Sequence, residues 1–510
     1  MTGISGRGQS VGARPVEAEL VDLTRWARRV RASGPPAAMD QYLAGFESFF
    51  NGYAARVAYW RARNPGYHQS ICSLARFYVP RGARVLEVGC ATGDLLAALE
   101  PSEGVGVDLS EAMVRRASER HPHLTFHRMA AERLELPGGT FDYIVLSDLM
   151  GYLYDIRGAF ERLRAVCHPQ TRVIIHWYSR VWQPVVHLLE WLGLKHPLPI
   201  LNWTTVEDVE NLLRLAGFEP LRARGHILLP LRLGSVGRWI NRVLAYLPVF
   251  RWFVWTNWVV ARPASRPTSR VPPVSVVCPC RNERGNIEQL VRRVPALGSH
   301  TELIFVEGHS TDGTLEECRR MIAAYPDRDI KVLVQTGQGK ADAVRLGFSR
   351  ASGDLLMILD ADLSVAPEDL PQFYDALVSG VGEFAMGSRL VYTMDPKAMR
   401  FLNLVGNRFF GLLLSVLIGQ PIKDPLCGTK VIWRRDYERL AAGRAHFGEF
   451  DPYGDFELIF GAAKLHLRIV EIPIRYRERS YGAPNINRFA DGWLLLRMSA
   501  VAAGRLFFVA

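Results

Sequence analysis

The chain has 510 residues, of which 48% are apolar and 22% charged. This composition excludes a disordered chain and a disulfide-rich scaffold, and the length suits roughly two to four domains. The formal net charge is +11, and residues 220–273 contribute +9 of it, because they hold nine arginines and no Asp, Glu or Lys. A nucleic-acid-binding protein usually spreads its basic residues over a domain face, so we expect no nucleic-acid partner.

Seven cysteines occur without a paired metal-site spacing, since Cys278 and Cys280 are separated by one residue. We expect free thiols in a reducing cytosol. The first twenty residues lack the basic and apolar regions of a secretory signal. No apolar run is long enough for a confident spanning helix, because Arg251 interrupts the best candidate, residues 243–261. These features predict a cytoplasmic protein.

The order of patterns along the chain predicts two α/β domains. Residues 1–40 are rich in Gly, Pro, Ala and Arg and read as a flexible leader. A first domain is predicted over 41–260, beginning with an aromatic-rich helical stretch. Residues 261–273, rich in Pro, Ser and Arg, are predicted to form a linker that neither becomes helical nor buries side chains. A second alternation of strands and helices spans 274–510.

The first domain has the pattern of a nucleotide-binding fold. A buried strand at 85–88 leads into a turn that contains Gly89 and Gly93, where the backbone can approach a ligand closely. A second strand ends in Asp108, whose carboxylate could accept hydrogen bonds from both hydroxyls of a ribose. Further strands are predicted at 124–129 and 141–146.

On the E-x-G-x-x-x-G turn, the acid that ends the second strand and the FDYIVLSDLMGYL stretch, residues 65–230 resemble class I S-adenosylmethionine-dependent methyltransferases. The resemblance implies a Rossmann-like fold and S-adenosylmethionine as cofactor. By position it implies these cofactor-binding residues: Glu87, Gly89 and Gly93 at the methionine and ribose end, Asp108 on the ribose, Ala131 or Glu132 beside the adenine, and Ser147 with Asp148 facing the transfer site.

One departure from this family is Ala91, which stands where glycine is frequent. The base that would serve methyl transfer stays open among Asp148, Tyr152 and His176. The alternative for the whole domain is a dinucleotide-binding or degenerate Rossmann unit, although the G-x-G-x-x-G spacing is absent.

The second domain carries paired acids after a buried strand. Strands are predicted at 274–280 and 302–306, and Lys340 at the start of a helix would suit an anion such as a diphosphate. The apolar strand 355–359 ends in Asp360 and Asp362. Two carboxylates so close together favour a divalent cation, Mg²⁺ or Mn²⁺, bound with a diphosphate.

With PCRNE, STDGT, QGK, LDAD, Gly387-Ser388-Arg389 and the segment 423–430, residues 274–510 resemble glycosyltransferase family 2, which has the GT-A fold. The closest resemblance is to dolichyl- or polyprenyl-phosphate glycosyltransferases. It implies a nucleotide border of Pro279, Asn282, Glu283 and Glu307, a metal on Asp360 and Asp362, phosphate contacts from Arg389 and Lys430, Asp424 as general base, and Asp455 as the second candidate base or a helix N-cap.

The family usually has two acids where this chain has Glu307 followed by Gly308 and His309. That departure leaves the nucleotide, UDP or GDP, open.

Three segments suggest a membrane surface as partner. Residues 400–419 and 493–508 read as amphipathic helices in the lipid interface or as ordinary core helices. We call residues 221–273 the basic strip. Its arginines, Arg238, Arg242 and Arg251 among them, alternate with aromatic residues, which suits an anionic bilayer. We therefore expect a peripheral protein on the inner face of the cell membrane.

Together these features favour a bifunctional enzyme. It would combine methyl transfer with inverting glycosyl transfer from a sugar nucleotide to a polyprenyl phosphate or a related cell-envelope acceptor. One alternative is a monofunctional glycosyltransferase whose first domain only binds cofactor or docks to the membrane. Another is a polysaccharide or protein glycosyltransferase that uses no lipid phosphate.

Overall fold

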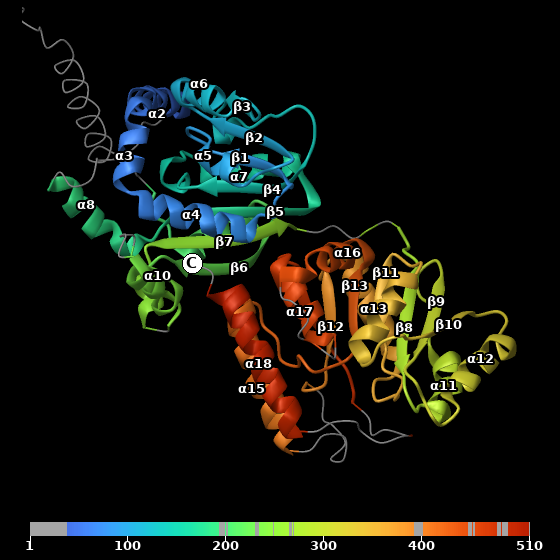
Figure 1. Cartoon of the computed structure of the whole chain (residues 1–510). Helices are drawn as coiled ribbons and strands as arrows, with labels where there is room; N and C mark the ends of the chain where they lie inside the picture. The colour runs from blue at the N-terminus through green and yellow to red at the C-terminus, as the bar shows by residue number, and fades with distance from the viewer. Residues whose placement is uncertain are drawn as a thin grey trace, which may run out of the picture. The chain divides into compact units, whose positions relative to one another are not determined.

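The computed structural model describes residues 38–192, 199, 202–229, 234–247, 249–264, 268, 270–391, 401–446, 451, 454–476, 481 and 488–508. Two compact units divide at Ala264 and Ser265, and each is described by itself (Figure 1). The division falls inside the predicted linker. The predicted leader lies almost wholly outside the described residues, and its end already belongs to a helix that begins at Met39.

Unit 1 is built on a seven-stranded sheet in the order β3-β2-β1-β4-β5-β7-β6. Strands β1 to β5 run parallel, whereas β7 is antiparallel to both of its neighbours. The strands are β1 Arg84–Val88, β2 Glu103–Asp108, β3 Thr125–Arg128, β4 Phe141–Ser147, β5 Cys167–Tyr178, β6 Phe218–His226 and β7 Thr256–Pro263. The predicted strands of this unit therefore form, with ends shifted by one residue.

The helices of unit 1 cover this sheet and the edge where its parallel strands end (Figure 1). They are α2 Met39–Tyr53, α3 Val57–Arg63, α4 Pro65–Tyr78, α5 Asp94–Ala98, α6 Glu111–Arg120, α7 Ile156–Leu163, α8 Gln183–Trp191, α9 Val206–Leu215 and α10 Gly234–Arg242, with short 3₁₀ turns that include η2 Ala131–Arg133, η5 Arg180–Trp182 and η7 Phe250–Phe253. The core lies between the apolar side chains of β1, β4 and β5 and the inner faces of α7 and α9.

The basic strip and the linker differ from their predictions. Residues 218–226 and 256–263 form the sheet strands β6 and β7, so Arg222 and Arg262 are buried and Trp258 is a core residue. Arg262 is paired with Glu219, whose carboxylate accepts from its guanidinium at 2.7 Å. The first residues of the predicted linker thus belong to a buried strand, because β7 continues to Pro263. Within the basic strip, residues 234–253 keep a described, exposed surface that could meet a membrane.

Unit 2 has a mixed seven-stranded sheet in the order β10-β9-β8-β11-β13-β12-β14. Strands β10, β9, β8 and β11 are parallel, and β13 runs antiparallel to β11 and β12. The strands are β8 Val274–Cys280, β9 Thr301–Glu307, β10 Asp329–Val334, β11 Leu355–Ile358, β12 Phe384–Ser388, β13 Lys430–Trp433 and β14 Ile469–Pro473.

The helices of unit 2 include one that departs from its predicted start. They are α11 Arg284–Arg293, α12 Thr314–Ala324, α13 Lys340–Arg350, α14 Leu370–Val378, α15 Phe401–Ile418, α16 Arg434–Ala442, α17 Asp455–Lys464 and α18 Arg488–Ala502. Gly313 occupies the N-cap of α12 in a left-handed conformation, instead of the predicted Thr311 or Asp312. Asp312 still contributes, since its Oδ1 accepts the backbone N–H of Thr314 at 3.1 Å.

Helix α15 packs against α18 and is apolar on two faces. Phe410, Leu414 and Leu417 face the interior, whereas Val405, Phe409, Leu412 and Val416 are exposed. No helix in the described part of the chain is long and apolar enough to cross a bilayer. All seven cysteines are free thiols, as predicted.

Candidate functional sites: a pocket in unit 1 and an acidic strand end in unit 2

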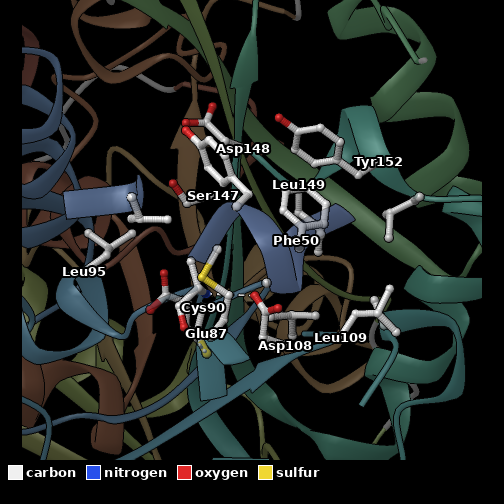
Figure 2. Close-up of a pocket in the computed structure, with 18 of the residues that line it drawn as sticks. Phe50, Glu87, Cys90, Leu95, Asp108, Leu109, Ser147, Asp148, Leu149 and Tyr152 are labelled. Carbon is white, nitrogen blue, oxygen red and sulfur yellow. Dashed lines mark hydrogen bonds between the residues drawn. The ribbon is translucent and has the colours of Figure 1, made fainter. Parts of the chain in front are cut away.

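A pocket of about 650 Å³ opens where β1, β2 and β4 of unit 1 end. Residues from the ends of these strands line one part of it, and helices α2 to α4 line another. Figure 2 shows Glu87 and Asp108 on one side of the pocket and Asp148 and Tyr152 on the other. The predicted cofactor residues other than Gly93 therefore share one cavity with the predicted transfer site.

Asp108 organises the turn after β1 through backbone hydrogen bonds. Its Oδ2 accepts the N–H of Ala91 at 2.8 Å, and its Oδ1 accepts the N–H of Ser110 at 2.9 Å. Burial raises the pKa of this carboxyl although both N–H donors oppose the shift. Ala91 adopts a left-handed conformation with φ of 46°, which explains why glycine is favoured at this position.

Glu87 lies buried at the floor of the pocket. Its Oε2 accepts the backbone N–H of Leu96 at 3.0 Å. Burial raises the pKa of Glu87 to about 8, although Arg61 favours its ionised form. A cation bound nearby would stabilise the carboxylate and return the pKa toward its ordinary range.

The remaining predicted cofactor residues divide between the pocket wall and its support. Gly89, Ala131, Glu132 and Ser147 line the pocket. Glu132 is held in place, because its Oε1 accepts the N–H of Tyr154 at 2.9 Å. Gly93 is not among the described lining residues. A Cβ at Gly93 would lie 2.6 Å from the Phe126 ring. The missing side chain therefore lets the backbone at the start of α5 pack closely against that ring.

Helices α2 to α4 contribute pocket residues that the motifs did not identify. Phe46, Phe50 and Tyr53 come from α2, and Tyr67 comes from α4. Arg61 on α3 pairs with Asp94 at the start of α5. The aromatic richness of residues 41–80 was the available signal, but a helical aromatic stripe more often marks a core than a ligand site.

In unit 2, parallel register brings the turns after β8, β9 and β11 to one edge of the sheet. The turn after β8 is clamped to the turn after β9. Asn282 has a left-handed φ of 56°, and its Oδ1 accepts the N–H of Thr311 at 2.9 Å. Glu307, which ends β9, accepts the N–H of Ser310. Pro279 and Glu283 lie at the same edge, and Glu283 accepts from Asn286 at 2.7 Å.

Four charged side chains alternate in sign at the end of β11. The Nζ of Lys340 lies 2.6 Å from Oδ1 of Asp360 and 3.9 Å from Oδ2 of Asp455. The Nζ of Lys430 lies 2.9 Å from Oδ1 of Asp455. Burial alone would raise the pKa of Asp360, but Lys340, with Lys430 and Arg389, brings it below the ordinary value. We call these four residues the charge chain.

Gly428 packs directly onto the charge chain. A Cβ at this position would lie 1.9 Å from Oδ2 of Asp360 and 2.6 Å from Nζ of Lys340. Both side chains would have to move to admit even a methyl group. The glycine in the predicted segment 423–430 therefore has a steric reason.

The donor set at the end of β11 fits a divalent cation that is shared with a diphosphate. Asp362 is buried, and its Oδ1 accepts the N–H and Oγ–H of Ser364 at 3.0 and 2.6 Å. No group of three or more His, Cys, Asp or Glu side chains in the described ranges could hold a metal by itself. Mg²⁺ and Mn²⁺ commonly use one or two carboxylates together with substrate phosphates, which matches Asp360 and Asp362.

Asp424 has a geometry that does not fit the predicted role of general base. Its Oδ2 accepts from the backbone N–H and Nε–H of Arg389 at 2.8 and 2.7 Å. Its Oδ1 accepts from Nη2–H of Arg389 at 2.7 Å and from Asn407 at 2.6 Å. Burial would raise the pKa of Asp424, but Arg389 lowers it below the ordinary value. A fully buried carboxylate with this depressed pKa is a poor proton acceptor, and it positions the guanidinium of Arg389.

Comparison with known proteins agrees with these two folds. Residues 59–223 match the family described as "Methyltransferase domain", and residues 275–441 match "Glycosyl transferase family 2". The low-salt glycan biosynthesis hexosyltransferase Agl6 of Haloferax volcanii is 34% identical over 241 residues, which cover 46% of this chain and 55% of that protein.

Two further relatives are named for lipid-phosphate mannose chemistry. The dolichol-phosphate mannosyltransferase of Pyrococcus furiosus is 31% identical over 217 residues, 41% of this chain and 58% of that protein. The polyprenol monophosphomannose synthase of Mycolicibacterium smegmatis is 29% identical over 229 residues, 44% of this chain and 83% of that protein. The chain thus spans little more than half the length of the first two relatives.

The two sheets, the pocket and the acidic strand end agree with these matches. The chain is therefore an enzyme that contains a Rossmann-like methyltransferase domain followed by a GT-A domain of glycosyltransferase family 2.

Proposed function

We propose that the chain is a bifunctional enzyme. The second domain transfers a sugar, with inversion, from a UDP- or GDP-sugar to a polyprenyl phosphate or a related cell-envelope acceptor. The first domain transfers a methyl group from S-adenosylmethionine. The lipid part of this proposal rests on helix α15. One face of this helix is an exposed apolar stripe, and the other face supplies Asn407, a hydrogen-bond partner of the carboxylate that holds Arg389.

The exposed stripe of α15 suits an acyl or prenyl chain. Val405, Phe409, Leu412 and Val416 recur at helical spacing, and 70% of Leu412 is exposed. On the inner side of the same helix, Asn407 donates to Oδ1 of Asp424 at 2.6 Å. Asp424 in turn holds Arg389. An apolar tail along the stripe would therefore run toward a guanidinium that suits its phosphate.

The charge chain suits the diphosphate of a sugar nucleotide. Lys340 lies 2.6 Å from Asp360 and could turn to a phosphate oxygen when a cation meets the carboxylates. A bound Mg²⁺ or Mn²⁺ would take up the negative charge that develops on the leaving diphosphate. Asp360 and Asp362 would hold that cation, and Asn282, Glu283 and Glu307 would border the nucleotide.

The acceptor reduces the need for a strong base. A phosphate monoester already carries negative charge, so Arg389 and Lys430 would position it for direct displacement at the anomeric carbon. Asp455 stays a candidate base for an acceptor that carries a proton. Its Oδ1 lies 2.9 Å from Nζ of Lys430, beside the cation that would meet the phosphate.

The surface around η7 supports a peripheral attachment to anionic lipid. Trp239, Trp252 and Phe253 are exposed, and Arg242 and Arg251 lie among them. The indole N–H of Trp182 donates to the carbonyl of Phe253 at 3.0 Å, which joins η5 and helix α8 to this region. Helix α8 adds exposed Leu188 and Trp191, and its C-cap residue Leu192 is also exposed; none of these belongs to the basic strip. Arg238 of the basic strip has a side chain outside the described residues.

A second candidate is a glycosyltransferase whose first domain binds without methylating. Ala91 favours it, because this alanine departs from the methyltransferase pattern at a position where glycine is frequent and φ is 46°.

The lipid-transfer proposal predicts an organic-extractable product. Incubation with labelled UDP- and GDP-sugars and polyprenyl phosphate should yield labelled lipid. Gly428→Ala should reduce the yield at least roughly 100-fold, because the added Cβ displaces Asp360 and Lys340. Gly443→Ala is the matched control, since its nearest atoms would lie at 3.6 Å, and it should keep full activity. Failure to form an extractable product with any donor would contradict lipid transfer. An active Gly428→Ala variant would show that Asp360 is not part of the glycosyl-transfer site.

The methyl-donor proposal predicts binding that depends on pH. Glu87 has a pKa of about 8 in the free protein because of burial. A cationic ligand favours its ionised form, so binding of S-adenosylmethionine should release a proton and tighten as pH rises from 6 to 8. The gain is at most about tenfold per pH unit and should level off above pH 8. Calorimetric titration of the whole chain measures it, and Glu87→Gln should remove this part of the pH dependence.

Absence of S-adenosylmethionine binding at every pH would contradict the proposal that the enzyme is bifunctional. An unchanged pH profile in Glu87→Gln would instead show that this carboxylate does not meet the positive charge of the ligand.

The attachment proposal predicts co-sedimentation with vesicles that contain anionic phosphatidylglycerol and little with pure phosphatidylcholine. Replacing Arg242 and Arg251 by Gln should weaken partitioning roughly 30-fold, because each cation near such a surface contributes about 1 kcal/mol. The same change at Arg319 and Arg350, which are exposed in unit 2, should have little effect. Unchanged sedimentation of the first variant, or an equal loss in the second, would refute attachment through η7.

A further inference from the structure

One end of the unit 1 pocket contains a buried polar cluster that the cofactor contacts do not use. Tyr67, Asp148, Tyr152 and Tyr178 line it, and His176 lies directly behind. Figure 2 places Ser147, Asp148 and Tyr152 on the side away from Glu87 and Asp108. This end is therefore available to a methyl acceptor when a cofactor occupies the other.

Asp148 is held in a defined orientation at the end of β4. It adopts a left-handed φ of 54°, and its N–H donates to the carbonyl of His176 at 2.9 Å. The hydroxyl of Tyr67 donates to Oδ2 at 2.9 Å and lies 3.1 Å from Oδ1. His176 Nδ1 lies 3.5 Å from Oδ1 and 3.2 Å from the hydroxyl of Ser147. A carboxylate has about four acceptor positions, so these contacts leave room for a ligand proton.

The side chain of Asp148 is 28% exposed, whereas that of His176 is 1% exposed. The carboxylate therefore reaches the pocket and the imidazole does not. Burial lowers the pKa of His176, which keeps it neutral. Burial and the Asp148 carboxylate raise the pKa of Tyr67 well above its usual value, so its hydroxyl keeps its proton. Within this cluster, Asp148 is the group that can both meet a ligand and accept a proton.

The basic side chains among the described lining residues do not supply a free cation. Arg61 is paired with Asp94. His68 is neutral, because burial, with Arg61 adding, lowers its pKa to about 4. Aromatic walls without a free cation disfavour a phosphate or carboxylate at the reacting atom. They suit an uncharged group on an apolar or sugar-like body.

We propose that Asp148 is the proton acceptor for methyl transfer and that the methyl acceptor is a hydroxyl or amine that bears a proton and no negative charge. This inference rests on the proposed methyltransferase activity. As the acceptor oxygen or nitrogen bonds to the methyl carbon, the carbon–sulfur bond of S-adenosylmethionine breaks and its electron pair stays on sulfur. The proton that the acceptor loses passes to a carboxylate oxygen of Asp148. Tyr67 and His176 are positioning residues for that carboxylate.

Two cofactor analogues test the position of Asp148 without a known acceptor. S-adenosylhomocysteine lacks the transferable methyl group. Sinefungin replaces the sulfur and its methyl group by a carbon that carries an amine, which is protonated at pH 7. If Asp148 faces the transfer point, the whole chain should bind sinefungin at least tenfold more tightly than S-adenosylhomocysteine in calorimetric titration.

Asp148→Asn should remove this preference while changing the affinity for S-adenosylhomocysteine less than about twofold. Tyr67→Phe, which keeps all charges, should reduce the preference severalfold by releasing the carboxylate. Glu135→Gln removes an exposed carboxylate outside the pocket and should change neither affinity.

A sinefungin preference that survives in Asp148→Asn would overturn the inference. An equal loss of both affinities would also overturn it, because that result marks a structural role. Failure of the unaltered chain to bind either analogue would overturn the proposed cofactor site and this inference with it. Binding of both analogues without a preference would overturn the inference alone.

Discussion

Parallel strand register is the constraint on which both sites depend. In unit 1, β1 pairs in register with β2 and β4, and in unit 2, β8 pairs with β9 and β11. Every turn that follows such a strand meets its neighbours at one edge of the sheet. Left-handed residues occur at several of these turns, namely Ala91, Asp148, Asn282 and His309. These left-handed conformations lie at the strand ends that carry both candidate sites.

The two edges solve the problem of buried charge in different ways. In unit 2, the charge chain alternates in sign, so each of its two carboxylates has a lysine Nζ within 2.9 Å. Such a chain can exchange partners when a diphosphate and a cation enter. In unit 1, Arg61 and the N–H of Leu96 offset only part of the effect of burying Glu87. Burial therefore raises the pKa of Glu87 to about 8. This pocket is suited to a ligand that itself brings positive charge.

The sequence motifs predicted the two folds and the approximate positions of the strands before the candidate sites, because glycine turns and acids after apolar strands have few structural solutions. The contacts of Asp424 could not be predicted, since Arg389 and Asn407 reach it from 35 and 17 residues away. The prediction that the whole basic strip faces a membrane was also wrong in part, because Arg222 and Arg262 are buried in the sheet. Tyr67 was missed because its partners, Asp148 and His176, meet it only through tertiary packing.

The most direct test of the account is whether the end of β11 binds a nucleoside diphosphate together with a divalent cation. Titration of the whole chain with UDP and GDP, with and without Mn²⁺, measures this by calorimetry. We expect that at least one nucleotide binds when Mn²⁺ is present and that Asp362→Asn abolishes that binding while S-adenosylhomocysteine still binds unit 1. Equally tight binding without metal, or unchanged binding by Asp362→Asn, would contradict it.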